Sequence, residues 1–566
     1  MKQTLLFSLL FFCIFLNQTS AQSNFQKQIK TGKKAFNNRL TKTTDGGYIH
    51  LGEADDFAGN DSVTHKLVIT KLDGDANITW MKSFLDTTKR NILIESYYES
   101  SLNVVQAEDG GYIISTQVPL LVFKLDAAGE LAWSEKIGLL SASYSLYTKT
   151  DMEPSAGGVI ITGTIIQPTS PQTSSFILNI DGSNGNVQWF KSLNFKNEIS
   201  GYAYSIYSNA VEAMKDGSYV ICGTVTHKKN DDNAFIAHFN KDGKLNGTRN
   251  FSYPNRFTAI KETLNGSFLT AGSIKRSRVY ADYDVCVMSF DASVNVNWAK
   301  QITITDNSLP KNNEQVTTIL ANPDNSFIMA GQKRPLSDGY VFKLTSAGNA
   351  EWAKLISHTD KLGIKLNDLA TTADNGFIAA GDYSEGKAFF AGKEGYFSLY
   401  KFNSDGNTCI QTSPLQTVTD FQYIDFADRI MMAEDLTGLV QVSASSVTKL
   451  PVHYSVKDIC KSLKALSVVY SEKSSISKKQ ADACSVKVFP NPVSGRVLNI
   501  SINYPKINAV QLTVLNTDGN VMMSRNVLLN PGVTNIALPV NLAAGIFILK
   551  VTVGNQQQTV KFVKVD

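Results

Sequence analysis

The sequence is poor in the residues on which metal sites and disulfide frameworks depend. Among 566 residues there are 6 cysteines and 6 histidines, and no histidine pair or cysteine–histidine group has the spacing of a zinc site. The motifs of phosphate-binding loops, nucleophile elbows and thiol–disulfide exchange are absent as well. We therefore expect no metal, no cofactor and no catalytic residue of these classes.

Excess charge and long apolar runs are also missing. The net charge is +4 without a dense basic cluster, which argues against nucleic-acid binding. The most apolar run, 5–16, is about 12 residues long, whereas a membrane-spanning helix needs about 20. It follows Lys2 and precedes Thr19-Ser20-Ala21, an arrangement typical of a cleaved secretory signal. We expect residues 1–21 to be a signal peptide, the rest to be exported, and no transmembrane segment.

The cysteines divide into two groups. Cys222 and Cys286 stand within apolar runs, which predicts small buried thiols. Cys409, Cys460 and Cys484 lie late in a chain expected to enter a compartment that permits disulfides. One pair among these three is expected, but the sequence does not choose the partners.

A turn followed by an aromatic residue recurs along the chain. TTDGGYIHLG (43–52) returns as AEDGGYIIST (107–116), MKDGSYVICG (214–223), NPDNSFIMAG (322–331) and TADNGFIAAG (372–381). Aligned on the residue before the aromatic or β-branched residue, seven copies appear at intervals of 47 to 64 residues: Gly47, Gly111, Gly158, Ser218, Ser267, Ser326 and Gly376. The turn aspartate gives way to Ala156 and Asn265 in two copies, and Asp and Asn favour turns, so we interpret these acids as structural.

Each copy continues into a second signature. ITKLDGDANITWMK (69–82) is echoed by VFKLDAAGELAWSEK (122–136) and VFKLTSAGNAEWAK (341–354). All five tryptophans of the chain occupy the same place in this signature: Trp80, Trp133, Trp189, Trp298 and Trp352. We predict that they pack between neighbouring repeats.

One repeat predicts four short strands. Asp-Gly and Asn-Gly supply the positive φ of tight hairpins, and β-branched and aromatic residues fill the strands. A four-stranded sheet must stack on its neighbours, and radial closure of seven such sheets is a β-propeller. We therefore predict an all-β chain with a seven-bladed propeller of four-stranded blades over 22–412. Segment 25–32 matches the fourth-strand pattern and is expected to complete the last blade. Residues 413–484 are expected to add strands to the propeller and to end in a Ser/Lys-rich linker.

The repeat pattern resembles the divergent propellers grouped with quinoprotein-like and kelch-like repeats. This resemblance covers about residues 25–412 and rests on the pattern rather than on a diagnostic motif. It implies a fold, and a fold does not fix an activity.

The last eighty residues carry a more specific pattern. In order, they show Pro490-Asn491-Pro492, an Asp518-Gly519 turn, the element with Leu542, Gly545 and Phe547, and a terminal Lys-x-Val strand. Together these features predict a small β-sandwich over 485–566. They closely resemble the type A C-terminal sorting domain of type IX secretion substrates. The resemblance implies export across the outer membrane of a Gram-negative bacterium by the type IX machinery, with the product secreted or attached to the cell surface.

Chemistry beyond export has little support in the sequence. Asp73-Gly-Asp75-Ala-Asn77 begins like a calcium loop, but Ile78 and Phe84 stand where the loop needs Gly and Glu. Two stretches, 200–209 and 273–284, are candidate surface contacts.

Two hypotheses follow for the function. The preferred one is a secreted or cell-surface, non-catalytic propeller that contacts a glycan, a protein or a surface through its loops. The alternative is an extracellular polysaccharide hydrolase or lyase with acids at the central opening. Two or three non-repeating carboxylates or histidines that converge at the channel would favour the enzyme.

Overall fold

The computed structural model describes most of residues 24–458 and 485–565. Not described within these ranges are 33, 59–61, 87–101, 117–119, 141–144, 167–172, 196–203, 228–231, 276–282, 306–312, 335–337, 357–362, 385–394, 410, 412–413, 426–430, 446, 451, 490–492, 494–496, 505–507, 517–519, 530–531, 541 and 554–555. The expected signal peptide, the linker, Cys460 and Cys484 lie outside the described residues, as do the Pro490-Asn491-Pro492 and Asp518-Gly519 motifs. The chain forms two compact units, Met1–Lys461 and Ser462–Asp566.

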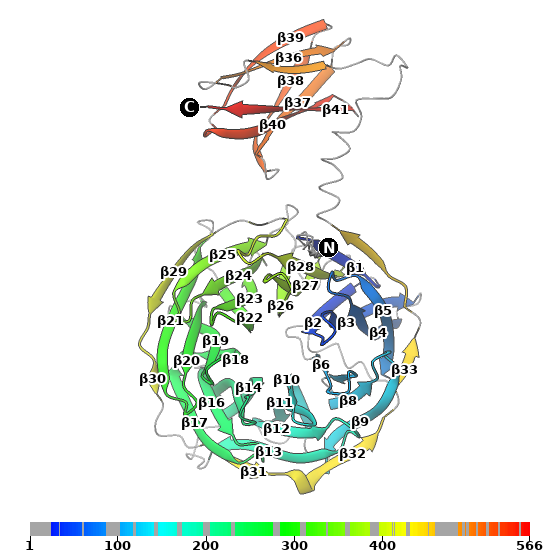
Figure 1. The fold of residues 1–566 in the computed structure, drawn as a ribbon, viewed down its shortest axis with the longest axis vertical. Coiled ribbons are helices and arrows are strands. Elements are labelled where there is room, and N and C mark those ends of the chain that lie inside the picture. The colour runs from blue at the N-terminus through cyan, green and yellow to red at the C-terminus, as the bar shows by residue number, and fades with distance from the viewer. Residues whose placement is uncertain are drawn as a thin grey trace, which may run out of the picture. The chain divides into compact units, whose positions relative to one another are not determined.

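The first unit is a ring of antiparallel sheets around a central opening (Figure 1). Its described strands fall into seven consecutive groups, here called blades 1 to 7, and the first strand of each blade lies nearest the centre. Blade 1 comprises β2 (Lys34–Lys42), β3 (Tyr48–Ala58), β4 (Ser62–Leu72) and β5 (Ile78–Asp86); blade 2 comprises β6 (Asn103–Gln106), β7 (Tyr112–Ser115), β8 (Leu120–Leu125) and β9 (Leu131–Leu139). Blade 3 comprises β10 (Ser145–Ser155), β11 (Gly158–Ile166), β12 (Thr173–Asp181) and β13 (Val187–Phe195); blade 4 comprises β14 (Tyr204–Ala213), β15 (Tyr219–His227), β16 (Asn233–Phe239) and β17 (Leu245–Tyr253). Blade 5 comprises β18 (Arg256–Glu262), β19 (Phe268–Lys275), β20 (Tyr283–Phe290) and β21 (Val296–Thr305); blade 6 comprises β22 (Asn313–Ala321), β23 (Phe327–Arg334), β24 (Asp338–Leu344) and β25 (Ala350–Ile356); blade 7 begins with β26 (Gly363–Thr371), β27 (Phe377–Ser384) and β28 (Gly395–Phe402). The prediction of an all-β propeller is confirmed.

The N-terminal strand closes the ring. β1 (Gln26–Lys30) pairs antiparallel with β28, with Ile29 opposite Phe397, and so supplies the fourth strand of blade 7. This confirms the prediction made from segment 25–32. Blades 7 and 1 also meet directly, because the backbone N–H of Asn38 donates to the Asp382 carboxylate at 3.3 Å.

A run of short strands, here called the belt, encircles the blades (Figure 1). It comprises β29 (Leu415–Asp420), β30 (Ile424–Asp425), β31 (Met431–Asp435), the 3-10 helix η1 (Thr437–Leu439), β32 (Val440–Ala444), β33 (Val447–Leu450) and β34 (Ser455–Asp458). These strands pair antiparallel, in that order, with the outer strands of blades 5, 4, 3, 2, 1 and 7. Six blades therefore have five strands, and among the described residues blade 6 has four. The strands between 415 and 458 thus form outer strands of the blades.

The five tryptophans pack at the boundaries between neighbouring blades, five of the seven in the ring. Each indole packs on a positive-φ glycine in the turn that follows the third strand of the next blade: Trp80 on Gly129, Trp133 on Gly185, Trp189 on Gly243, Trp298 on Gly348 and Trp352 on Gly406. A β-carbon at these glycines would lie between 2.6 and 3.0 Å from the nearest indole atom. Only glycine combines this φ with so close an approach.

Two blade boundaries depart from this rule in a consistent way. Gly247 of blade 4 stands at the tryptophan position, and the turn residue of blade 5 opposite it is Val294, with φ +67°. At the ring closure, Phe25 replaces tryptophan and Ala76, with φ +55°, replaces glycine; both belong to one buried cluster. A side chain larger than glycine is present in the turn only where tryptophan is missing.

Four of the repeated turn acids, Asp45, Asp109, Asp324 and Asp374, pair with lysines of the third strand. Lys71 Nζ lies 2.8 Å from the Asp45 carboxylate, and Lys401 Nζ lies 2.6 Å from that of Asp374. Burial alone would raise the pKa of Asp45, but hydrogen bonds from Lys71, Thr43 and Gly47 lower it to about 2. These contacts give the turn acids a structural role.

The second unit is a β-sandwich. One sheet contains β35 (Ser485–Phe489), β36 (Val497–Tyr504) and β39 (Gly532–Pro539); the other contains β37 (Asn508–Asn516), β38 (Val521–Leu529), β40 (Gly545–Val553) and β41 (Gln556–Lys564). Ile500 of the first sheet and Leu549 of the second share one buried core. Phe547 is 6% exposed and stacks on Phe562 at 5.7 Å between ring centroids.

Candidate functional site

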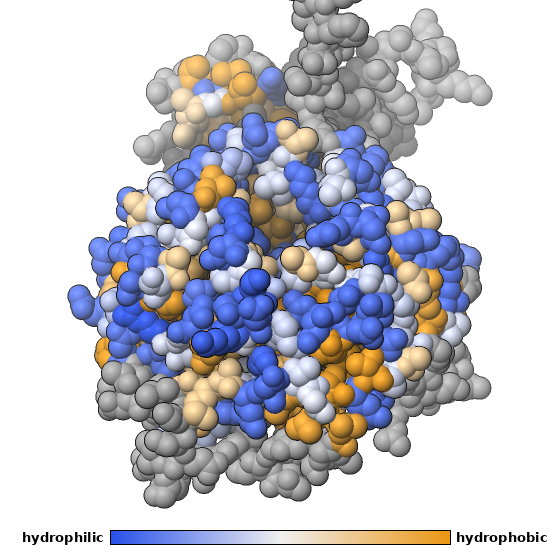
Figure 2. Space-filling view, turned by 60° about the horizontal axis from the view of Figure 1, so that its bottom comes forward, coloured by the Kyte–Doolittle hydropathy of each residue, from blue (hydrophilic) through white to orange (hydrophobic). Residues whose placement is uncertain are grey.

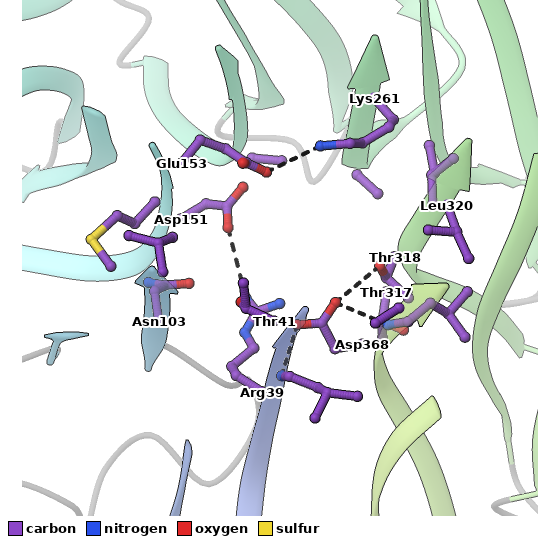
Figure 3. Close-up of a pocket in the computed structure, with 18 of the residues that line it drawn as sticks. Arg39, Thr41, Asn103, Asp151, Glu153, Lys261, Thr317, Thr318, Leu320 and Asp368 are labelled. Carbon is purple, nitrogen blue, oxygen red and sulfur yellow. Dashed lines mark hydrogen bonds and ion pairs between the residues drawn. The ribbon is translucent and has the colours of Figure 1, made fainter. Parts of the chain in front are cut away.

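A cavity of about 290 Å³ lies where the first strands of all seven blades meet (Figure 3). The strand pairing places side chains from the seven blades at matching levels. A level is here a set of equivalent first-strand positions, one from each blade. At the first level each residue pairs with the one just before the repeated second-strand glycine, or before Thr116 in blade 2. The residues are Arg39, Asn103, Asp151, Ala210, Ala259, Thr318 and Asp368. Two residues further along each strand lies the second level: Thr41, Val105, Glu153, Glu212, Lys261, Leu320 and Ala370.

The side chains at these levels do not repeat from blade to blade. At the first level an arginine, an asparagine, two aspartates, two alanines and a threonine occupy equivalent positions. The scaffold is therefore built equally well with or without charge here. Charged groups that a repeated fold does not need are candidates for a function.

Several polar side chains at the centre are nevertheless used to join neighbouring blades. Thr41 donates to the carbonyl of Val104 at 2.7 Å, and Thr258 donates to that of Val316 at 2.7 Å. Thr317 reaches the carbonyl of Leu366 at 2.6 Å in the same way. These hydroxyls link the inner strands around the ring.

Three buried carboxylates also accept backbone N–H groups across blades. Asp151 accepts from Val211 at 3.0 Å, and Asp368 accepts from Leu40 at 3.1 Å. Glu212 accepts from the N–H of Glu262 at 3.0 Å and pairs with Lys261 at 2.8 Å. Each of these acids contributes to blade packing through at least one oxygen.

The remaining charges face the cavity with looser pairing (Figure 3). Arg39 donates through Nε to the carbonyl of Leu102 at 3.1 Å, while its Nη2 lies 3.9 Å from Asp151 Oδ1. Glu153 meets Lys261 at 3.4 Å and is 30% exposed. Arg39, Glu153 and the outer oxygen of Asp151 are thus the groups best placed to contact a ligand.

Burial is the main cause of the raised pKa values of three acids at the cavity. Burial raises the pKa of Asp151 to about 6; Arg39 opposes this shift and the charges of Glu153 and Asp368 add to it. Burial likewise raises the pKa of Asp368 despite Arg39. Burial raises the pKa of Glu212 to about 7, against the attraction of Lys261. Shifted carboxyl groups that cluster in a cavity are typical of functional sites.

The residues singled out in the sequence lie away from this cavity. None of the repeat glycines and tryptophans lines it. Of the two candidate surface stretches, 200–209 contributes Asn209 to the lining, and much of 273–284 lies outside the described residues. In the calcium-like turn, Lys27 Nζ donates to the carbonyls of Asp75 and Ala76 at 2.8 and 2.9 Å. Over the described part of the chain, no group of three or more His, Cys, Asp or Glu side chains is placed to hold a metal ion.

The cavity acids were not predicted from the sequence, because that prediction was based on positions that repeat from copy to copy, and these acids stand at positions that do not. The signal was present at the first-strand position about eight residues before each anchor. There the seven copies disagree most in charge, from Arg39 to Asp368. A difference in charge between equivalent positions of the copies therefore marks the candidate site.

The belt adds a second surface feature. Leu140 and Leu439 are 61% and 51% exposed, and the N–H of Leu140 donates to the carbonyl of Leu439 at 2.8 Å. Figure 2 shows mostly hydrophilic side chains on the face that it draws, with apolar side chains gathered toward the lower part of that face.

Among the described residues no helix is long and apolar enough to cross a membrane.

Comparison with known proteins identifies the C-terminal unit. Residues 487–565 match the family model described as the secretion system C-terminal sorting domain. The predicted sorting domain is thus confirmed, and it marks the chain for secretion or for export to the cell surface. No curated protein matches the chain.

Solved structures show similarity at low identity. They include a catalytically inactive virginiamycin B lyase from Staphylococcus aureus with quinupristin (11% identity, TM-score 0.34, covering 64% of this chain and 99% of that one). A GH43 β-1,3-galactosidase with galactodeoxynojirimycin has 12% identity and a TM-score of 0.28, covering 46% and 91%. Regucalcin, a calcium-binding protein from Agrobacterium tumefaciens, has 12% identity and a TM-score of 0.26, covering 53% and 88%. Similarities of this size transfer no activity.

Proposed function

We propose that this chain is a non-catalytic binding protein, secreted or held on the cell surface after export by the type IX machinery. It contacts a glycan, a protein or a surface through its propeller loops and its central cavity. The observation that carries the proposal is the set of non-repeating charged side chains at matched levels of the cavity. Other blades have alanine at the same level, at Ala210 and Ala259, so the scaffold does not require a charge there.

The topology supports a division between the two faces of the ring. Because the strands of a blade are antiparallel, the short repeated turns, such as 43–47 and 73–77, all lie on one face. The connections on the other face differ in length: 59–61 joins β3 to β4, whereas 385–394 joins β27 to β28. Variable connections on a rigid scaffold are where binding residues are usually found.

The test is a glycan array probed with the full chain, followed by product analysis on every glycan that binds. Binding without bond cleavage is the expected result. The matched variant is Glu153→Gln, which keeps the shape of the side chain and removes its charge. Absence of binding to any glycan, protein or surface tested in parallel would contradict the proposal.

A second candidate is an extracellular polysaccharide hydrolase or lyase, favoured by the convergence of Asp151, Glu153 and Asp368 on one cavity (Figure 3). The raised pKa of Asp151, about 6, would keep part of its population protonated near neutral pH, as a general acid requires. Against this, Asp151 and Asp368 each hold a backbone N–H of the next blade. Turnover that is lost in Glu153→Gln or Asp151→Asn, with folding intact, would replace the binding proposal by this one.

A further inference from the structure

The central cavity has more negative charge than its cations can balance. The lining contains Asp151, Glu153 and Asp368, and the buried carboxylate of Glu212 lies directly behind it. Lys42 lines the cavity too, but its ammonium group binds the exposed hydroxyl of Thr371 at 3.0 Å.

The two other cations are already engaged. Lys261 lies closest to Glu212, at 2.8 Å, and makes a longer contact with Glu153, at 3.4 Å. Arg39 lies 3.9 Å from Asp151, the outer limit of an ion pair, although both Asp151 and Asp368 sense its charge. Lys42 keeps its charge when it binds a neutral hydroxyl, so four carboxylates, Glu212 included, face three cations. One negative charge is left in excess.

We propose that the cavity binds a compact, hydroxyl-bearing ligand through a protonated amine, with Glu153 and Oδ1 of Asp151 accepting its N–H groups. Asp368 contributes attraction across the cavity, and the polar side chains of Arg39, Thr318 and Asn103 also line it. This inference rests on the proposed function and names the ligand class of the same site.

An ammonium group fits this arrangement better than a metal ion. Asp151 Oδ2 accepts a backbone N–H, and both oxygens of Asp368 accept one, from Leu40 and from Leu369. The acids therefore do not present several open oxygens to one point. A metal ion needs several oxygens at about 2–2.6 Å around one point. An ammonium group instead has three N–H donors that point in separate directions, and it can serve acceptors that stand apart.

The size of the cavity sets the ligand class. A volume of about 290 Å³ is at the lower end of the range for small-molecule sites, which are roughly 300–1,000 Å³. A monosaccharide with a free amine combines that size with hydroxyl groups for the polar lining. Glucosamine is therefore the probe, with glucose and N-acetylglucosamine as uncharged counterparts of nearly the same shape.

The experiment is calorimetric or ligand-observed NMR titration of the full chain at pH 7. We expect glucosamine to bind and the two uncharged sugars to bind at least about tenfold more weakly, because a buried charge pair is lost. Glu153→Gln and Asp151→Asn should each weaken glucosamine binding by about tenfold or more. Asp420→Asn, at a belt carboxylate that is 82% exposed, is the matched control and should bind like the wild type.

The outcomes separate this inference from the proposed function. Equal binding of glucosamine and glucose, or unchanged glucosamine binding by both cavity variants with their fold intact, would overturn the amine site and leave a binding protein. Glycan binding on the array without binding of glucosamine would overturn it as well and place recognition in the loops. Calcium ions that displace glucosamine with higher affinity would show a metal site instead. Glucosamine binding with an otherwise empty array would support the amine site and contradict the broader glycan proposal.

Discussion

The indole of Trp352 lies so close to Gly406 that a β-carbon on this glycine would be 2.6 Å from Trp352 Cζ3. The two residues belong to blades 6 and 7, and the same contact recurs at four other blade boundaries. An aromatic ring on a bare Cα gives a large buried contact without a side chain in between. This pair therefore explains both the repeated tryptophan and the repeated turn glycine.

Substitution at Gly406 should show how much of this role depends on the ring contact. Gly406→Ala combines a positive φ of +72° with a clash, so we expect a loss of about 2–4 kcal/mol in the free energy of unfolding. The matched control is Gly110→Ala, where φ is +82° but nothing lies within 4 Å of the added carbon. It should lose only about 1 kcal/mol. Urea denaturation measures both, and equal losses would show that backbone strain alone is responsible.

The exceptional boundary between blades 4 and 5 offers the reverse experiment. Gly247→Trp alone should not stabilise the protein, because Val294 occupies the surface that the indole needs. Combined with Val294→Gly, the new tryptophan can adopt the packing of the other five. We expect a favourable coupling of about 1 kcal/mol or more in a double-mutant cycle of unfolding free energies. Simple additivity of the two substitutions would contradict the Trp–Gly rule.

Asp151 and Asp45 should respond to pH with opposite signs. The folded-state pKa of Asp151, about 6, lies above its ordinary value of 3.8, so its ionised form costs stability above pH 6 and the cost disappears below pH 4. Asp151→Asn should therefore stabilise the protein at pH 8 by about 1–3 kcal/mol, with a gain that vanishes toward pH 4.

Asp45 supplies the contrast. Its pKa is lowered to about 2, so its contribution to stability is present above pH 4 and is lost as the pH falls to 2. Asp45→Asn should destabilise at neutral pH, and the difference from the wild type should close in acid. Thermal unfolding from pH 2 to 8 measures both variants, and parallel pH profiles would refute the assigned environments.

Cys409 is disulfide-bonded, and its Sγ lies 3.9 Å from the carbonyl of Asn24. We predict Cys460 as its partner, because Asp458, two residues earlier in the chain, pairs with Lys27 near Asn24. Cys222 and Cys286 are buried cysteines outside any disulfide.

Such a bond would join the beginning of the belt to its end. We expect a Cys409–Cys460 peptide in mass spectra of unreduced digests. Cys409→Ser and Cys460→Ser should cost the same, about 2–4 kcal/mol, whereas Cys484→Ser should cost nothing. A Cys409–Cys484 peptide would contradict this pairing.

Removal of the sorting domain tests the export route. A chain that ends at residue 484 should enter the periplasm and remain there, because the segment matched to the sorting family, 487–565, is gone. Fractionation with an antibody against the propeller measures its location. Normal surface display or secretion of the truncated chain would show that export does not depend on this domain.

The sequence by itself determined the repeat, and the repeat determined the propeller. Turn glycines and aromatic residues such as Gly47 and Tyr48 recur because every blade needs a tight turn that leads directly into a buried strand. The match of segment 25–32 to the fourth-strand pattern was enough to predict how the ring closes. The sorting domain was equally readable, since its motif is local in the chain.

Only the tertiary structure decided the belt and the cavity. Belt strands such as Val447–Leu450 are held by backbone hydrogen bonds to an open sheet edge, and such pairing demands almost no side-chain pattern. The cavity combines Arg39, Asp151 and Asp368, which are up to 329 residues apart and share no motif. Their meeting, and the excess of negative charge that it creates, arises from closure of the ring and not from any local property of the chain.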